Sequence, residues 1–369
     1  MKEWKLYKLS DFIHFNPTLS LKKGTIAKKI TMDQLIPYSR EIYSWVNEPY
    51  SGGAKFQNGD TIMARITPCL ENGKHAYVSI LDNNEIAYGS TEYFVMRGIE
   101  GVSDNLFVYY LTHYPEFKNA AIKSMVGSSG RQRAQLDVLK NLEYELPDLD
   151  EQIQIATLLS SIDDKIALNK RINDNLEQQA RELFKSWFIN SPQESWKEKS
   201  LSDYFNVITG KKDANYSTPE GAYPFFTCSQ DILKAPSYSF DGHAILVAGN
   251  GDFNVKRYIG KFEAYQRTYV LIPHEEKFHA FLYLMIDYYL PEITGGSRGS
   301  VIKFITKGNI ANFRFRVPQN NIDDQLKKLN DIYKIIDCNL EESSRLTKMR
   351  DTLLPKLMSG ELKINEIDC

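Results

Sequence analysis

The sequence predicts an α+β protein in which two β-rich domains, built on one repeated plan, alternate with two long helices that pack on each other. The chain has 369 residues, too many for one ordinary core and enough for two or three domains. Short motifs recur in the same order in both halves. After each series of motifs the spacing of hydrophobic residues changes from about 2 to about 3.5, which marks a change from strands to helices.

Five recurring features carry the repeat. Trp4-Lys5 is followed by Leu9-Ser10-Asp11, and Trp196-Lys197 is followed at the same interval by Leu201-Ser202-Asp203. Next come a turn with a buried strand, a second strand in which Ala, Tyr and Thr recur at identical spacing, a Gly/Ser turn, and a strand that ends at proline. These four features occupy residues 59–65, 87–95, 127–130 and 146–147 in the first half, and residues 241–248, 264–271, 295–300 and 317–318 in the second. Five features in one order indicate a duplication.

The repeat divides the chain into four segments. We expect β-rich domains at residues 1–147 and 191–318, each followed by a helical region, at residues 148–190 and 319–369. The first helix should run from about Leu149 to Trp187 and the second from about Ile322 to Met358. Pro355 is expected to kink the second helix or to end it a turn early. At 1.5 Å per residue, each helix is roughly 55–60 Å long.

Each helix carries a seam of residues that step alternately by four and three, as in coiled coils. The first seam consists of Ile155, Leu159, Ile162, Ile166, Asn169, Asn173, Leu176, Ala180 and Leu183. The second consists of Ile322, Leu326, Leu329, Tyr333, Ile336, Leu340, Ser343, Thr347, Arg350, Leu354 and Leu357. Both seams are polar in the middle. Either these polar residues fix the register, or a neighbour such as Ile172 or Leu346 takes the core position. Because long amphipathic helices do not stay alone in water, we expect the two to pack together and to leave other faces for partners.

The composition is that of a soluble globular protein, with 42% hydrophobic and 25% charged residues. The net charge of −2 argues against a simple basic DNA-binding module. The four cysteines are far apart and form no CxxC pair, so we expect no disulfide framework, no zinc site and a reduced, cytoplasmic setting; they are Cys69, Cys228, Cys338 and Cys369. The N-terminus lacks an apolar signal core, and no apolar run reaches about 18 residues, so we expect no membrane span.

Three segments resemble catalytic motifs, but a structural role explains each better. Residues 163–165, with the Pro-Asp at 147–148, fit a loose nuclease pattern, yet they lie in a heptad helix rather than on adjacent strands, and we expect them at solvated helix positions. His274 and His279 are five residues apart, so they do not share a helix face as a zinc-protease pair does. The Gly-Asn-Gly at 249–251 is typical of a hairpin turn. No P-loop and no Asn/Asp-Pro-Pro tetrapeptide of an amino-methyltransferase occurs. We therefore expect no catalytic centre and no metal site in this chain.

Positive charge is concentrated at equivalent places in the two halves. Residues 117–136 and residues 293–322 contain lysines and arginines but no Asp or Glu, and both segments include the Gly/Ser turns. Contact with phosphates requires cations, backbone N–H groups and small residues that allow close approach. An ordinary solvated loop is the alternative for either segment alone. Their recurrence at matching positions favours a nucleic-acid surface that acidic helices offset in the total charge.

The order of domain, helix, domain, helix resembles the specificity subunit of Type I restriction-modification systems over almost the whole chain. The residues that carry the resemblance are LEYELPDLDEQI (142–153) and LFKSWF (183–188) in the first half, and KFEAYQRTYV (261–270) and LLPKLMSGEL (353–362) in the second. The second helix departs from the pattern, because Asp323-Asp324-Gln325 follows a longer, Asn-rich lead-in. The second domain is also shorter than the first, which indicates different loops and different half-sites.

The resemblance implies a function and a set of partners. Two target-recognition domains would each read one half of a bipartite site on double-stranded DNA. The helices would form an antiparallel coiled coil that docks two methyltransferase subunits, and restriction/translocase subunits would complete the complex. The chain itself would bind no cofactor, because S-adenosylmethionine, ATP and Mg²⁺ are expected on the partner subunits.

Base recognition uses Arg or Lys for guanine and Asn or Gln for adenine. The candidate DNA-binding residues are Arg65, Lys123, Ser128, Arg131, Gln132, Arg133, Lys256, Arg257, Gln266, Arg267, Ser297, Arg298 and Lys303. Among them, Lys256-Arg257 is interpreted as a phosphate contact, and Arg267 has the alternative of pairing with a nearby carboxylate. The candidate residues for the coiled coil and subunit docking are Ile155, Leu159, Ile162, Ile166, Leu176, Leu326, Leu329, Ile336, Leu340 and Leu354.

Helix length limits the spacing of the half-sites. Domains at opposite ends of a spacer of roughly 55–60 Å cannot read half-sites more than about 16–18 base pairs apart, and about one helical turn is more natural. We therefore expect that lengthening both helices by whole turns increases the spacer in the recognised site. The methylated sequence would be read before and after the insertion, and an unchanged site would contradict this hypothesis.

Two other functions remain as alternatives at this point. One is a self-contained DNA-modifying enzyme with an unfamiliar centre, which would transfer a methyl group or cut DNA without a partner. The other is a coiled-coil scaffold whose globular ends bind protein, which would show no salt-dependent binding of DNA.

Overall fold

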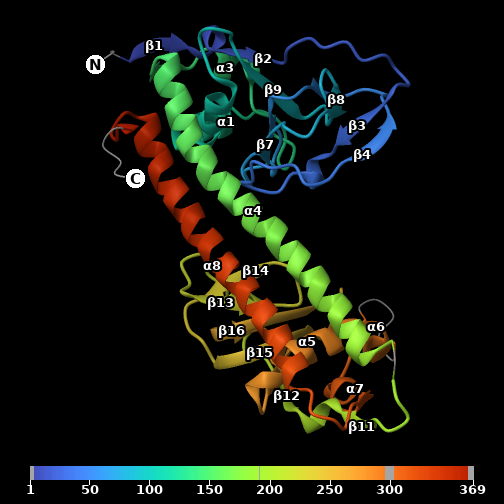
Figure 1. Ribbon diagram of the computed structural model, residues 1–369. Coiled ribbons are helices and arrows are strands. Elements are labelled where there is room, and N and C mark those ends of the chain that lie inside the picture. Colours follow the sequence, from blue (N-terminus) through green and yellow to red (C-terminus); the bar gives the residue numbers. More distant parts are fainter. Residues whose placement is uncertain (1–3, 191, 296–302, 365–369) are drawn as a thin grey trace. The chain divides into compact units, whose positions relative to one another are not determined.

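The computed structural model describes residues 4–190, 192–295 and 303–364. By its internal contacts the chain divides into two units, residues 1–170 with 341–369, and residues 171–340. Each unit contains one β-rich domain and one part of each long helix (Figure 1). The four-segment division therefore stays a prediction, because both helices contribute to both units.

In the first unit, three groups of strands surround a short helical layer. Strand β1 (Lys5–Lys8) pairs with β10 (Glu143–Leu146). One antiparallel sheet has the order β2 (Ile13–Phe15), β9 (Tyr93–Gly98), β6 (Thr61–Ala64) and β7 (His75–Tyr77). A second sheet has the order β4 (Val46–Pro49), β3 (Ile26–Ile30), β8 (Ala87–Gly89) and β5 (Lys55–Phe56). The helices are α1 (Asn105–His113), α2 (Pro115–Lys123) and α3 (Leu136–Lys140), and the 3-10 turns are η1 (Leu9–Asp11) and η2 (Met32–Gln34).

The second unit follows the same plan with one continuous sheet. Strand β11 (Lys197–Ser200) pairs with β18 (Arg314–Val317). The six-stranded sheet has the order β12 (Phe205–Thr209), β17 (Thr268–Pro273), β15 (Phe240–Ala248), β16 (Val255–Ala264), β13 (Tyr223–Phe226) and β14 (Ile232–Ala235). Helix α5 (His279–Tyr288) lies beside β15 and β16 (Figure 1). Helices α6 (Leu290–Thr294) and α7 (Lys307–Ala311) follow, and the 3-10 turns are η3 (Leu201–Asp203), η4 (Ala214–Tyr216) and η5 (Glu276–Phe278).

The strand orders confirm the duplication. The order β2-β9-β6-β7 of the first unit matches β12-β17-β15-β16 of the second, and the β1–β10 pair matches β11–β18. The parallel pair β3–β8 matches the parallel pair β13–β16. The difference is that β16 is ten residues long and joins both parts into one sheet, whereas in the first unit its place is taken by the separate strands β7 and β8.

The sequence analysis aligned the two halves by their identical residues, and this alignment is wrong by two positions at β9 and its counterpart β17. Tyr93 lies opposite Ala64 at the end of β6, and Thr268 lies opposite Ala248 at the end of β15. Tyr93 and Thr268 are therefore equivalent, although the recurrence of Ala, Tyr and Thr aligned Thr91 with Thr268. Hydrogen-bond register, rather than residue identity, determines which positions correspond.

The two long helices have the predicted extents. Helix α4 covers Leu149–Phe188 and α8 covers Asp323–Met358, and α8 continues through Pro355 without ending early. The Asp148 carboxylate caps α4 by accepting from the Glu151 backbone N–H at 3.0 Å. Gln152 is fully buried, accepts from the Asp104 backbone N–H and donates to the Pro147 carbonyl. The resemblance motif at 142–153 thus joins the first domain to the helix that follows it.

The helices run antiparallel in each unit. In the first unit, Ile155 near the start of α4 shares a core with Leu357 near the end of α8. In the second unit, Phe184 near the end of α4 shares a core with Leu326 near the start of α8. Each hydrophobic core therefore extends from a β-rich domain into the helix pair, which explains why neither helix is left with a bare apolar stripe.

The middle of the α4 seam is polar, and no neighbour replaces the polar residues. Asn169 and Asn173 are 1% and 8% exposed, whereas Leu168 and Ile172 are 44% and 38% exposed. The Asn169 amide donates to the Glu342 carboxylate at 2.7 Å. The Asn173 amide donates to the Ile336 carbonyl at 3.3 Å. These hydrogen bonds give partners to two buried NH2 groups that would be costly to bury alone, and they fix the register of the two helices.

Leu340 does not lie in the seam, so this sequence prediction is wrong. Its side chain is 57% exposed. The neighbouring Asn339 takes the inward position and donates to the Asn173 side-chain oxygen at 2.8 Å. The step from Ile336 is therefore three residues instead of four, because the buried Asn173 needs a polar partner. The other ten predicted positions of the second seam are buried or half-buried.

This difference gives a matched pair of leucine substitutions in α8. Leu329→Ala, at a fully buried position, is expected to destabilise the protein by about 2–5 kcal/mol because it removes core contacts and leaves a cavity. Leu340→Ala is expected to stay within about 0.5 kcal/mol. Urea unfolding of the two variants measures both effects. Equal losses would contradict the seam described here.

Among the described residues, no helix is both long and apolar enough to cross a membrane.

Candidate nucleic-acid interface

In the first unit, three segments meet where β6 ends, and we call this place the first corner. The Arg65 backbone N–H donates to the Glu92 carbonyl at 2.9 Å, and the Ala134 N–H donates to the Arg65 carbonyl at 2.8 Å. The Thr67 N–H donates to the Gln132 carbonyl at 3.0 Å. Val126 and Arg133 exchange two hydrogen bonds, each 3.0 Å long, so residues 127–132 project as a turn. The Gly-Ser-Ser-Gly of this turn is exposed, as a segment that approaches a phosphate backbone must be.

The first corner brings together several of the predicted DNA-binding residues. Ser128 and Arg131 are exposed in the turn, Gln132 is half-buried, and Lys123 is exposed in the last turn of α2. The Arg65 guanidinium stacks on the Phe94 ring at 4.9 Å from its centroid. Packing against the ring holds the Arg65 side chain in place, so it can extend toward a ligand less far than the side chains of the turn.

Arg133 forms the strongest contact of the corner, with a residue that the sequence analysis did not single out. Its guanidinium donates to both carboxylate oxygens of Glu92, at 2.7–3.0 Å. The Arg133 side chain is 42% exposed and that of Glu92 is 23% exposed. The Glu92 carboxylate raises the pKa of Arg133 above its ordinary value, so the guanidinium stays charged.

The second unit repeats the same backbone frame, which we call the second corner. The Gly249 N–H donates to the Arg267 carbonyl at 2.8 Å, the Ile305 N–H donates to the Gly249 carbonyl at 3.0 Å, and the Gly251 N–H donates to the Lys303 carbonyl at 3.0 Å. These bonds correspond one by one to those of the first corner. The equivalent pairs are Arg65 and Gly249, Glu92 and Arg267, Gln132 and Lys303, and Arg133 and Phe304. The frame is the same, but the side chains differ at all four positions.

The second corner also gathers predicted DNA-binding residues. Arg267 is exposed, and among residues 4–190, 192–295 and 303–364 the structure shows no hydrogen bond or ion pair of its side chain. The Lys256 amine donates to the Ser229 carbonyl at 2.5 Å and to the Asn254 side chain at 2.7 Å, and burial lowers its pKa. The Gln266 amide donates to Asp213 at 2.6 Å. Ser297 and Arg298, which the sequence analysis also named, lie outside the described residues.

Arg257 lies against α8 and not on an open surface, which argues against its interpretation as a phosphate contact. Its guanidinium donates to both oxygens of Asp337 on α8, at 2.9 and 2.7 Å, and stacks over the Tyr333 ring at 4.2 Å. Its side chain is 9% exposed. Successive residues of a strand point to opposite faces, so Lys256 and Arg257 cannot both face the same ligand. The ion pair between Arg257 and Asp337 holds β16 against α8.

The first unit holds its domain to α4 in a corresponding way. Arg40, whose side chain is 9% exposed, donates to Asp164 and to the Ser160 hydroxyl. Asp164 follows the helix-start residue Gln152 by twelve positions, and Asp337 follows Gln325 by twelve. Each helix therefore carries an aspartate at the same position of the repeat, and this aspartate pairs with an arginine of the adjoining domain. The two arginines come from different parts of their domains. The sequence analysis missed both pairs, because the arginines lie in unrelated segments.

A buried ion pair crosses the helices of the first unit. Arg350 donates to Asp163 at 2.8 Å, and the Tyr110 hydroxyl donates to the other carboxylate oxygen at 2.7 Å. The side chains of Arg350 and Asp163 are each 5% exposed. The expectation of solvated helix positions for residues 163–165 is therefore wrong for Asp163, whose partners lie within the fold, although the side chains of Asp164 and Lys165 are 64% and 45% exposed. Among the described residues, no group of three or more His, Cys, Asp or Glu is placed to hold a metal ion.

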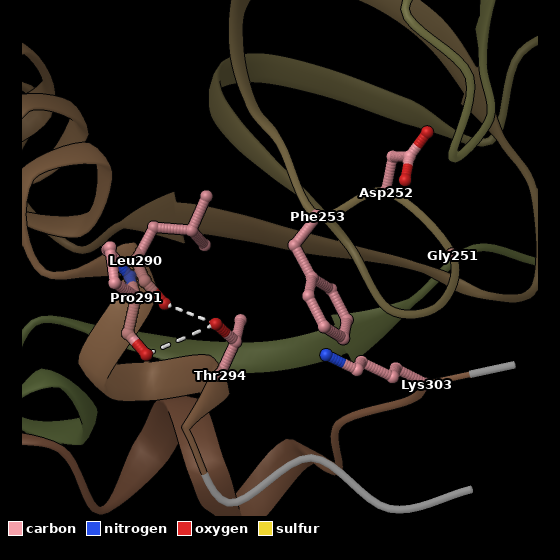
Figure 2. Close-up of a pocket in the computed structure, with 7 residues that line it drawn as sticks. All are labelled: Gly251, Asp252, Phe253, Leu290, Pro291, Thr294 and Lys303. Atoms are coloured by element: carbon pink, nitrogen blue, oxygen red, sulfur yellow. Dashed lines mark hydrogen bonds between the residues drawn. The ribbon is translucent and has the colours of Figure 1, made fainter. Parts of the chain in front are cut away.

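A pocket of about 630 Å³ opens beside the second corner. Its lining residues are Gly251, Asp252, Phe253, Leu290, Pro291, Thr294 and Lys303. In Figure 2 the Phe253 ring and the Lys303 amine point into this space, and the Thr294 hydroxyl is turned to the Leu290 and Pro291 carbonyls of its own helix. A cation beside an apolar wall suits contact with a sugar-phosphate backbone better than proton-transfer chemistry.

The chain is similar to known specificity subunits of restriction enzymes. The EcoDI specificity subunit of Escherichia coli is 39% identical over 172 residues, which are 45% of this chain and 38% of that protein. The HindI specificity subunit of Haemophilus influenzae is 21% identical over an alignment of 474 positions that spans 98% of this chain and 100% of that protein. The match thus spans well under half of the EcoDI subunit and the full length of the HindI subunit.

A solved structure and a family match agree with these relatives. The crystal structure of the S subunit of a Type I restriction-modification system from M. genitalium has a TM-score of 0.58 at 16% identity, over 96% of both chains, and so shares the fold. The family described as Type I restriction modification DNA specificity domain matches residues 1–178 and again residues 193–347. Two matches, one for each half of the repeat, show that the chain belongs to the family of Type I restriction-modification DNA specificity domains.

Proposed function

We propose that this chain is the DNA sequence-recognition subunit of a Type I restriction-modification complex, and that each β-rich domain reads one half of a bipartite site. The observation that carries the proposal is the duplicated corner. One backbone frame occurs twice and presents different side chains each time. The same backbone hydrogen bonds in both domains would let each domain approach the DNA duplex in the same way. The different side chains would let each domain recognise a different base sequence.

The charge distribution supports the same function. The net charge of −2 hides two acid-free segments, residues 117–136 and 293–322, and the described parts of both contribute to the corners. Contacts with phosphate need local positive charge rather than a basic protein as a whole. The acidic residues of the helices offset these segments in the total charge, and exposed charges more than about 8 Å apart are largely screened at physiological salt.

The helices are proposed to dock two methyltransferase subunits. Their outward faces carry apolar side chains that are 38–57% exposed, and such side chains favour helix-to-helix contact with a partner. On the first unit these are Ile153, Leu168 and Met349, and on the second they are Ile172, Ile335 and Leu340. The partners would bring S-adenosylmethionine, and restriction/translocase subunits would bring ATP and Mg²⁺ chemistry. The chain itself is proposed to be non-catalytic.

A reconstitution separates this function from its alternatives. The chain alone is incubated with DNA and labelled S-adenosylmethionine, and then again together with methyltransferase subunits. We expect no methyl transfer by the chain alone, transfer at one bipartite sequence by the complex, and affinity that falls steeply with salt, with a slope of about −0.9 per phosphate contact. Methyl transfer without a partner would favour a self-contained enzyme. A flat salt profile would favour a protein-binding scaffold.

A further inference from the structure

The Arg133 guanidinium is oriented by protein contacts on one edge and is open on another. An arginine side chain has five N–H donors. At the first corner, Nε–H and one Nη2–H bind the Glu92 carboxylate, and one Nη1–H binds the Arg131 carbonyl at 3.3 Å. One N–H therefore remains on each Nη nitrogen, and these two nitrogens stand at the end of the planar fork. The side chain is 42% exposed.

Two parallel N–H groups match one base edge in particular. In the major groove guanine presents two neighbouring acceptors, O6 and N7, and a bidentate arginine is the commonest contact specific for it. A guanidinium that a carboxylate already holds loses little conformational freedom when it binds, and its plane is set in advance. A phosphate contact needs no such bracing, because charge alone attracts the phosphate.

The second corner lacks this arrangement at the same positions. Arg267 stands where the first corner has Glu92, and Phe304 stands where it has Arg133. No carboxylate braces Arg267 among the described residues, and Phe304 is 36% exposed. The frame therefore offers an oriented fork in one half, and an exposed cation and an exposed aromatic ring at the equivalent positions of the other. The two halves of the chain are built for different contacts at equivalent places.

We propose that Arg133 reads a guanine in the half-site of the first domain, that Glu92 is the positioning residue for this contact, and that Arg267 contacts a phosphate in the other half-site. This inference rests on the proposed function and deepens it. It assigns one base pair of the unknown target to one side chain, and it explains why a carboxylate lies in a surface that binds an anion.

The test uses the reconstituted complex and a library of sites in which each base pair is varied. For Arg133→Lys, which keeps the charge but not the fork, we expect discrimination at one G·C pair of the first half-site to fall about ten- to hundred-fold. Glu92→Gln should weaken discrimination at the same pair and leave every other position unchanged. Arg267→Lys, the matched control, should keep discrimination everywhere. Arg267→Ala should weaken binding of all sequences alike and make the salt slope shallower by about one.

A change on the DNA side keeps the test valid if a variant folds poorly. Replacing the assigned guanine by 7-deazaguanine, which lacks N7, should weaken binding by the wild-type complex and have no further effect with Arg133→Lys. Inosine, which keeps O6 and N7, should be tolerated. If the wild-type complex shows no sequence preference, the proposed function fails. If it shows a preference that Arg133→Lys and 7-deazaguanine leave unchanged, this inference alone fails.

Discussion

Asp163→Ala is expected to destabilise the first unit by about 3–5 kcal/mol, one of the two largest effects we foresee. Asp163 and Arg350 are each 5% exposed, and their side chains lie 2.8 Å apart between α4 and α8. Removing the carboxylate leaves a guanidinium buried with one partner fewer, and it also takes the acceptor from the Tyr110 hydroxyl. Arg350 keeps its ion pair with the exposed Asp351, but the loss of the buried partner of a buried charge costs far more than the intact pair contributes.

Two controls separate the pair from its surroundings. The double variant Asp163→Leu with Arg350→Met removes both charges and is expected to recover most of the loss, because apolar side chains replace buried ions well. Glu48→Gln, in an exposed ion pair with Lys29 in the same unit, should cost less than about 1 kcal/mol. Urea unfolding, with hydrogen exchange of α1 to report the first unit, measures all three. A double variant less stable than Asp163→Ala would contradict this account.

Acidification from pH 7 to pH 5 is expected to weaken the first unit by about 4 kcal/mol through two histidines. His75 is buried and His113 is half-buried with its Nε2 atom inside the fold, and their ring centroids are 3.7 Å apart. Burial lowers the pKa of His75 to about 3 and holds the pKa of His113 well below its ordinary value of 6.5. Below pH 6.5 these two histidines therefore bind protons in the unfolded chain but stay neutral in the folded chain. Stability is fully present above that pH and falls progressively as the pH decreases, by about 2 kcal/mol per histidine at pH 5.

The second unit should respond more weakly, because one histidine there is in the same situation among the described residues. Burial lowers the pKa of His279 to about 4. Unfolding free energies of the wild type and of His75→Gln, taken at several pH values, measure the effect. The variant should lose about 2 kcal/mol less than the wild type between pH 7 and pH 5, and His14→Gln, at an exposed position, should behave as the wild type. A wild-type stability that stays constant over this range would show that these histidines become charged without unfolding.

The parts of the fold that follow from regular spacing could be predicted from the sequence. Both long helices have the expected extents. They could be predicted because hydrophobic residues recur about every 3.5 positions over many turns. The repeat also located the buried strands β6 and β15 and the strands β10 and β18, which end just before a proline. Leu340 could not be predicted, because the choice between it and Asn339 depends on Asn173 of the other helix. The alignment in β9 and β17 failed for a similar reason, since register depends on partners far along the chain.

The candidate DNA-binding residues could be predicted from the local composition of the sequence. The structure then showed which of them are paired or buried. Arg133 is visible in the sequence as a cation in an acid-free segment. Glu92, which orients it, lies 41 residues away and outside that segment. Arg257 has the same chemical character as its neighbour Lys256, yet it faces the helix. Sequence indicates which side chains can bind DNA, but burial and pairing determine which of them are available to do so.

The central claim is that this chain supplies sequence recognition to a methyltransferase. The most direct test is a genome-wide map of methylated sites in cells that contain the chain and its methyltransferase, compared with the same cells lacking only the chain. We predict one bipartite motif, two short half-sites separated by unread bases, that is methylated only when the chain is present. The same motif methylated in both cell lines would contradict the claim.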